Sequence, residues 1–223
     1  GPANFAKKFF MNYNPKANEP FFLYLSFMNP HDICYGAGFD PRFPNKLRPH
    51  QIAATQKYIE LRKTLSDEEY RSQVPPVPGN TEPNGAYAEI KEIGSGSRNW
   101  TEEQWAFYRW MYCRLVEDVE QQIGRVLAAL EESGLADNTI VVFTSDHGEM
   151  NQSHGLVFKS QLLEEATRTP LIISGPKVKK NIVDSINLTC GIDLVPTICD
   201  LAGIPIPENL SGKSLKPILT GET

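Results

Sequence analysis

The stretch that decides the fold reads Asp137-Asn138-Thr139-Ile140-Val141-Val142-Phe143-Thr144-Ser145-Asp146-His147-Gly148-Glu149. Its middle, residues 139–144, is β-branched and apolar throughout, which predicts a buried strand. A long helical pattern precedes this strand across a short turn, and the order helix, loop, buried strand is typical of an α/β fold. Polar and titratable side chains follow the strand directly, so its carboxyl end is the first place to look for chemistry.

The preceding helical pattern carries two start signals. Thr101 and Gln104 have the spacing of a capping box, and Trp100 is placed to pack against Trp105. From Tyr108 to Leu130 apolar residues then recur at steps of three and four. We therefore predict a long amphipathic helix with one buried stripe, ending near Gly134.

Further elements are predicted on both sides of this pair. Residues 4–12 read as a short helix, and the near-continuous apolar run 21–28 reads as a strand covered on both faces. After residue 149 the pattern predicts a strand at 170–174, a short strand at 183–188, a helix at 193–202 and a short helix around 215–219.

Residues 32–98 differ in composition from the rest of the chain. Prolines and glycines cluster there, with one predicted helix near 51–63 and another beginning at Ser66, where Glu69 completes a capping box. Irregular segments of this length inside a compact domain are usually functional or disordered. We expect a partly ordered excursion that roofs a pocket.

Bulk properties exclude several classes of protein. A chain of 223 residues suits one domain, and its net charge of −5 argues against nucleic-acid binding, which normally requires a basic surface. No apolar run approaches the roughly 20 residues that a membrane span requires. The start of the chain has no basic-then-apolar signal segment. Its four cysteines show no metal-binding or disulfide-framework spacing.

Two predicted strands end in titratable residues. The strand at 139–144 runs into Asp146 and His147, and the run 21–28 leads to His31. If the two strands are parallel neighbours, these side chains meet at one rim of the sheet. Carboxylate and imidazole together supply part of a metal shell. Taken singly, an aspartate here is more often a turn or cap residue, and a lone histidine is more often a satisfied, half-buried one.

His154 and Lys159 follow within a dozen residues of this cluster. Lys159 is preceded by the apolar run Leu156-Val157-Phe158, an unusual setting for a solvated lysine. An ammonium group that faces an anionic ligand explains the setting. The alternative is a surface lysine whose aliphatic stem lies along apolar neighbours.

These motifs together resemble the sulfatase family of the alkaline phosphatase superfamily. The resemblance rests on the stretch 137–149 with His154-Gly155 and Lys159, on residues 168–173, on 20–23 leading to 29–31, on 124–127, and on 193–197 with 200–203. It implies an alkaline-phosphatase-like α/β fold with a mixed, mostly parallel sheet flanked by helices. Residues 1–223 would then be a single partial domain, the second part of the catalytic domain, with the variable excursion at 32–98.

The resemblance also implies a role for each candidate residue. Asp146 and His147 match the later pair of calcium ligands, and Lys159 matches the lysine that holds the sulfate. His31 matches the histidine that contacts the sulfate and protonates the leaving oxygen, and His154 matches a histidine near the pocket. Cleavage of a sulfate ester requires positive charge at the sulfate oxygens and a proton for the departing alkoxide, so these residue types suit the reaction.

Other parts of the family's site have no counterpart in these 223 residues. The nucleophile, a formylglycine made from Cys/Ser-x-Pro/Ala-x-Arg, has no matching motif, and the early paired aspartates and a Lys-x-His are also missing. We therefore expect a fragment whose nucleophile lies outside this chain. Alone, it is predicted to have negligible sulfatase activity, weak metal affinity and a tendency to self-associate through exposed apolar edges.

Two other functions remain open. A phosphodiesterase or phosphonate-ester hydrolase of the same superfamily would use the same metal, lysine and histidine. A non-catalytic module would keep the fold without the chemistry. The resemblance favours a sulfated small molecule or sulfated glycan as substrate, and a periplasmic, secreted or lysosomal location.

Overall fold

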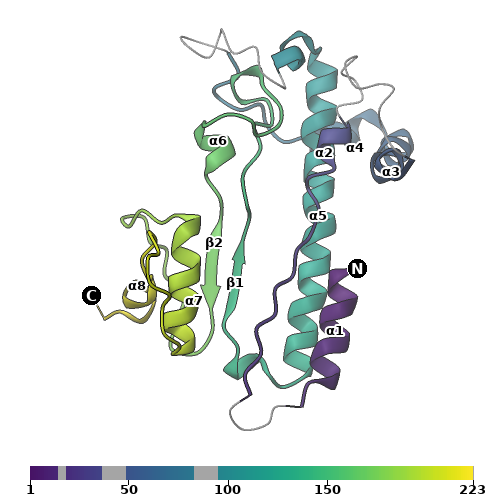
Figure 1. The fold of residues 1–223 in the computed structure, drawn as a ribbon. Helices are drawn as coiled ribbons and strands as arrows, with labels where there is room; N and C mark the ends of the chain where they lie inside the picture. The colour runs from purple at the N-terminus through teal and green to yellow at the C-terminus, as the bar shows by residue number, and fades with distance from the viewer. Residues whose placement is uncertain (15–18, 37–48, 83–94, 223) are drawn as a thin grey trace. The chain divides into compact units, whose positions relative to one another are not determined.

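The computed structural model describes residues 1–14, 19–36, 49–82 and 95–222 (Figure 1). Contacts divide the chain into two compact units. Unit 1 comprises residues 1–133 and 147–168, and unit 2 comprises residues 134–146 and 169–223. A single domain over residues 1–223 stays a prediction. Much of the predicted excursion, residues 37–48 and 83–94, lies outside the described residues.

Unit 1 is built on helix α5 (Glu102–Glu132). Its predicted start is confirmed: the Thr101 side chain accepts the amide of Gln104, and the Gln104 side chain accepts the amide of Thr101. The rings of Trp100 and Trp105 pack with their centroids 4.9 Å apart, as the apolar staple predicts. Gly134, with φ +70°, follows the helix end in the left-handed conformation typical of a C-terminal glycine.

The core of unit 1 gathers around the first half of α5. Trp105, Tyr108, Trp110, Met111 and Leu115 are buried there. They pack with buried residues from other segments, namely Ile33, Tyr58, Tyr70, Val157 and Phe158. The predicted stripe is less complete in the second half of the helix, where Val116 and Leu127 are exposed. The other segments of this core therefore pack on the aromatic side chains of the first half of α5.

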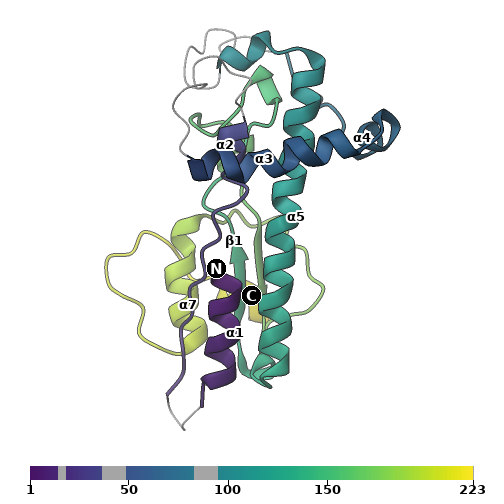
Figure 2. The same cartoon turned by 90° about the vertical axis from the view of Figure 1, so that its right-hand side faces the viewer.

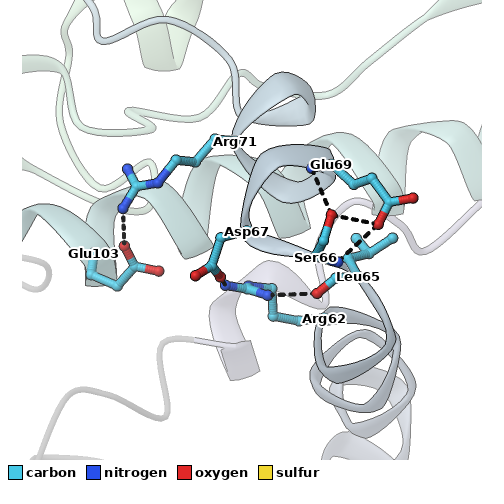
Figure 3. A network of polar contacts seen from close by, with 7 residues as sticks. All are labelled: Arg62, Leu65, Ser66, Asp67, Glu69, Arg71 and Glu103. Carbon is cyan, nitrogen blue, oxygen red and sulfur yellow. Dashed lines mark hydrogen bonds and ion pairs between the residues drawn. The ribbon is translucent and has the colours of Figure 1, made fainter.

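Within the excursion, the structure contains α2 (Ile33–Gly36), α3 (Pro49–Thr64) and α4 (Asp67–Gln73), followed by a 3₁₀ turn at Ser95–Asn99. The predicted capping box of α4 is confirmed, because Ser66 and Glu69 exchange side-chain and backbone hydrogen bonds (Figure 3). Arg62 of α3 bonds to Asp67 at 2.7 Å and covers the ring of Tyr70. Tyr70 in turn packs edge-on against Trp110, so α4 is docked on α5.

The N-terminal segment differs from its prediction. Helix α1 (Pro2–Asn12) lies along the second half of α5 in both views (Figures 1 and 2), and Arg125 of α5 bonds to Asn4. Residues 21–28 are extended, but they form no strand. Their burial alternates, with Phe22, Tyr24 and Met28 exposed, so the prediction of a strand covered on both faces is wrong. A strand needs a pairing partner, and none of the described residues provides one.

Unit 2 contains strands β1 (Val141–Thr144) and β2 (Leu171–Ser174), preceded by a 3₁₀ turn at Ala136–Asn138. Both strands were predicted, and they pair antiparallel with Val142 opposite Ile173. Among the described residues they are the whole sheet, so a parallel pairing of 139–144 with 21–28 is wrong. The two strands are less buried than predicted: Phe143, Thr144, Ile172 and Ser174 are exposed, and their other four residues are half-buried.

The rest of unit 2 is mostly helical or irregular. Helix α7 (Leu194–Ala202) and helix α8 (Lys216–Thr220) agree with the prediction, including Gly203 at the end of α7. The short strand predicted at 183–188 is absent. Instead, the Asp184 carboxylate accepts the amides of Ile186 and Asn187, each at 2.9 Å, and this Asx turn curls the backbone out of an extended path. In the part of the chain described here, no helix is long and apolar enough to cross a membrane.

Candidate functional site

The candidate residues of unit 1 lie on two segments, a turn at 28–36 and a loop at 147–163. The turn is fixed by backbone bonds from the His31 amide to the Met28 carbonyl and from the Cys34 amide to the His31 carbonyl. Ile33 anchors it in the aromatic core with 1% of its surface exposed. This anchoring holds His31 and Cys34 on one turn, with both side chains half-buried.

Gly148 opens the loop at a place where no side chain fits. A Cβ atom there would lie 2.0 Å from the carbonyl oxygen of Glu165, and the Gly148 amide donates to the carbonyl of Ala166 at 2.8 Å. Only glycine allows this close approach of two backbones. The glycine of the Asp-His-Gly motif therefore has a structural reason here.

Beyond Gly148 the loop folds back on itself. The Met150 amide donates to the Phe158 carbonyl, and the Gln152 amide donates to the Leu156 carbonyl. Several residues between them have positive φ angles, including His154 at +55° and Phe158 at +71°. The three residues before Lys159 are buried. Backbone hydrogen bonds thus close the loop on itself. Lys159 is the first residue after its buried segment, so the position of its backbone is fixed.

The Lys159 ammonium group points to the turn at 28–36. Its Nζ donates to Cys34 Sγ at 3.5 Å, which brings the lysine beside the turn that carries His31. Burial raises the pKa of the Cys34 thiol, and the charge of Lys159 opposes this rise. Cys34 is therefore a neutral thiol that accepts a weak hydrogen bond. A half-buried cation with such a partner can still bind an anion.

Glu149 is a further member of this cluster, and the sequence assigned it no role. Its Oε1 accepts the hydroxyl of Tyr108 at 2.9 Å and the amide of Phe158 at 2.6 Å. Burial raises the pKa of the carboxyl, while these bonds, the Asn151 amide and the charge of Lys159 act in the opposite direction. Burial, with Glu149 beside it, also raises the pKa of Tyr108 well above its ordinary value. The direct succession of Glu149 to Asp-His-Gly was the only sequence signal for it.

His154 lies in a different polar group. Its amide donates to the Asn80 carbonyl at 2.7 Å, its Nε2 is 3.7 Å from Glu165 Oε1, and the Asn80 side chain bonds to the same carboxylate at 2.6 Å. Next to it is a pocket of about 290 Å³, lined by Thr81, Glu82, Arg98, Trp105, Gln152 and Gly155. Residues of the excursion thus line a pocket beside the loop.

Asp146 and His147 are consecutive but differ in setting. Asp146 is exposed just past the end of β1, and His147 is half-buried with Nδ1 2.9 Å from the Gly148 carbonyl oxygen. The described residues contain no group of three or more histidine, cysteine, aspartate or glutamate side chains placed to hold a metal. Calcium takes six to eight oxygen ligands. These two residues alone do not fit a complete calcium site, so no step of the reaction is derived through the metal.

Comparison with known proteins establishes the family. The Sulfatase family model matches residues 3–204, so the chain belongs to the sulfatase family. Arylsulfatase K of Danio rerio is 28% identical over 225 residues, which cover 96% of this chain and 39% of that protein. The chain therefore spans about two fifths of the length of this relative.

Solved structures confirm the fold class. A 2-O GAG sulfatase superposes over 100% of this chain and 45% of its own, with a TM-score of 0.76 and 29% identity. A phosphonate monoester hydrolase from Silicibacter pomeroyi also covers 100% of this chain and 42% of its own, at a lower TM-score of 0.62 and 29% identity. The predicted α/β sulfatase-type fold is thus confirmed, with the chain as part of such a domain.

Proposed function

We propose that this chain provides the anion-binding and proton-donating part of a sulfuric-ester hydrolase site. Lys159 would bind the sulfate oxygens, and His31 would protonate the oxygen of the departing alcohol. The observation that carries the proposal is the bond from Lys159 Nζ to Cys34 Sγ, because it places the lysine beside the turn that holds His31. Membership of the sulfatase family supports the same reading of both residues.

The chemistry needs both groups. When the bond between sulfur and the ester oxygen breaks, that oxygen leaves with the bonding electrons and takes a proton from a general acid. Negative charge on the remaining sulfate oxygens is stabilised by a fixed cation in a site that excludes water. Half-burial of Lys159 and His31 suits these roles. The attacking nucleophile, expected to be formylglycine, would come from outside these 223 residues.

The remaining candidate residues complete the proposal. Asp146 and His147 would contribute two ligands to a calcium ion whose other ligands lie outside the described residues. His154 would contact the substrate from the side of the pocket at Arg98 and Gln152. The calcium, when bound, would supply positive charge to the sulfate group.

The substrate class we propose is a sulfated glycan or a sulfated small molecule. The solved 2-O GAG sulfatase of the same fold supports the glycan. A periplasmic, secreted or lysosomal location is proposed with it, on the ground of membership of the sulfatase family. No basic surface is expected to recruit nucleic acid, because the chain has a net charge of −5.

The test is a comparison of two substrates with the natural protein purified at its full length. We expect turnover of 4-nitrophenyl sulfate with a kcat/KM well above that for a phenyl phosphonate monoester. If the protein hydrolyses the phosphonate efficiently and leaves the sulfate ester uncleaved, the proposed activity is wrong and the protein is a phosphonate-ester hydrolase. No turnover of either ester would point to a non-catalytic member of the family.

A further inference from the structure

We propose that Glu149 is a positioning residue for Lys159. Its carboxylate, held by Tyr108, fixes the backbone of Phe158 and thereby sets the direction in which the next residue, Lys159, leaves the core. The inference rests on the proposed function in one respect, namely that Lys159 binds the sulfate. It adds a residue to which neither the sequence nor the family comparison gave a role.

The backbone of Phe158 has an unusual conformation. Its φ angle is +71°, in the left-handed region that bulky residues rarely adopt. Such a conformation costs free energy and persists only where the surroundings impose it. Outliers of this kind are concentrated at functional sites. The contacts that hold Phe158 in this conformation are therefore relevant to the candidate site.

Contacts from both its side chain and its backbone hold Phe158 in place. Its ring is buried in the aromatic core with 6% of its surface exposed, and its carbonyl accepts the Met150 amide at 2.8 Å. Its amide donates to Glu149 Oε1 at 2.6 Å. The acceptor in this last bond is an ionisable side chain, and bonds to charged acceptors are stronger than neutral ones.

Glu149 is itself anchored on the buried, aromatic first half of α5. The hydroxyl that holds it belongs to Tyr108, which lies on α5 with none of its surface exposed. A chain of contacts thus runs from α5 through Tyr108 and Glu149 to the Phe158 amide. Lys159 follows Phe158 directly and reaches Cys34 Sγ, and the negative charge of Glu149 attracts its ammonium group. Placement within about an ångström matters for such a group.

The first experiment measures amide hydrogen exchange by mass spectrometry on the natural full-length protein, which needs no activity. In Glu149→Ala we expect the Phe158 and Lys159 amides to exchange at least about tenfold faster, because a hydrogen bond to a charged acceptor is lost. Glu149→Gln keeps an acceptor oxygen and should stay within about threefold of wild type. The matched control is Glu164→Ala, an exposed glutamate in the same segment that pairs with Arg168.

The second experiment measures KM for 4-nitrophenyl sulfate with the natural full-length protein. A residue needed only for folding would lower the active fraction, hence kcat, and leave KM unchanged. We expect Glu149→Ala to raise KM about tenfold, Glu149→Gln to restore most of the loss, and Glu149→Ala to add little once Lys159 is alanine. Non-additivity of this kind identifies residues that act through one another.

The outcomes separate this inference from the proposed function. Unchanged exchange at Phe158 in Glu149→Ala, or independent effects of the Glu149 and Lys159 substitutions on KM, would overturn the positioning role. If the wild-type protein cleaves no sulfate ester, the proposed function fails and the exchange data still decide the role of Glu149. If Glu149→Ala does not fold, Tyr108→Phe replaces it, with faster exchange at Phe158 expected and unchanged exchange overturning the role.

Discussion

The two groups of candidate residues in this chain differ in how far the chain itself completes them. Lys159 lies in a closed loop whose neighbours are fixed by Glu149, Tyr108 and the aromatic core. Asp146 is exposed, and with His147 it supplies only two ligands. An anion can be bound by one anchored cationic side chain, whereas a calcium site needs six or more ligands brought together from several segments. The residues proposed to bind the anion are therefore positioned within this chain, whereas those proposed to bind the metal form no complete site among the described residues.

The largest effect that we predict from this difference is the loss of turnover in the 223-residue chain alone. The 223-residue chain alone should give no hydrolysis of 4-nitrophenyl sulfate above the uncatalysed rate, because its sequence has no nucleophile motif and its described residues form no complete metal shell. A spectrophotometric assay over a day with added calcium checks this. Measurable turnover that is lost in Lys159→Ala would show that the chain contains a working nucleophile.

The hydrogen bond from the Tyr108 hydroxyl to Glu149 should contribute measurably to the free energy of unfolding. Tyr108→Phe leaves the buried Glu149 carboxylate without one donor, at a cost of about 1–3 kcal/mol in the free energy of unfolding. Urea unfolding of the chain measures this. Tyr112→Phe, on the same helix, is the matched control and should change little, since its hydroxyl bonds to none of the residues that the structure describes. Equal effects of the two substitutions would contradict the anchor.

Glu149 should also make the stability depend on pH. Its pKa is raised in the folded chain above the ordinary 4.5, so the folded state favours the protonated carboxyl. This contribution is fully present below pH 4.5 and is lost as the pH rises through the folded pKa. The free energy of unfolding of Glu149→Gln should therefore increase relative to wild type as pH rises from about 4.5. Urea unfolding from pH 4 to 8 tests the sign, and a constant difference would contradict it.

Calcium should have the smallest effect. With two ligands, the chain should bind the ion with a Kd of about 1 mM or weaker, a value typical of the weakest protein sites. At 1 mM calcium the gain in the free energy of unfolding is then at most about 0.4 kcal/mol. Isothermal titration calorimetry with wild type and Asp146→Asn measures the affinity. Micromolar binding that depends on Asp146 would show a more complete metal site than the described residues contain.

Much of the local structure followed from the sequence. The capping boxes at Ser66 and Thr101 were predicted because their signals lie within four residues. The strands at 141–144 and 171–174 were found from β-branched apolar runs. The run 21–28 was misjudged because a strand depends on a partner elsewhere, which composition does not reveal.

The candidate site shows the same division. Lys159 was found because its apolar neighbours made it unusual, and its position beside the turn at 28–36 accords with that reading. Glu149 was overlooked because its partners, Tyr108 on α5 and the Phe158 amide, meet it only through tertiary structure. The roles expected of Asp146, His147, His31, His154 and Lys159 all stay predictions.

The most direct test of the central claim is the effect of Lys159→Ala on sulfate-ester hydrolysis by the natural full-length protein, with Lys180→Ala, an exposed lysine, as the control. Removal of one charge-stabilising group from such a site typically lowers the rate about 10²- to 10³-fold. We predict a loss of this size in kcat/KM for Lys159→Ala and wild-type kinetics for Lys180→Ala. Kinetics of Lys159→Ala equal to those of wild type would contradict the assignment of Lys159 as the sulfate-binding cation.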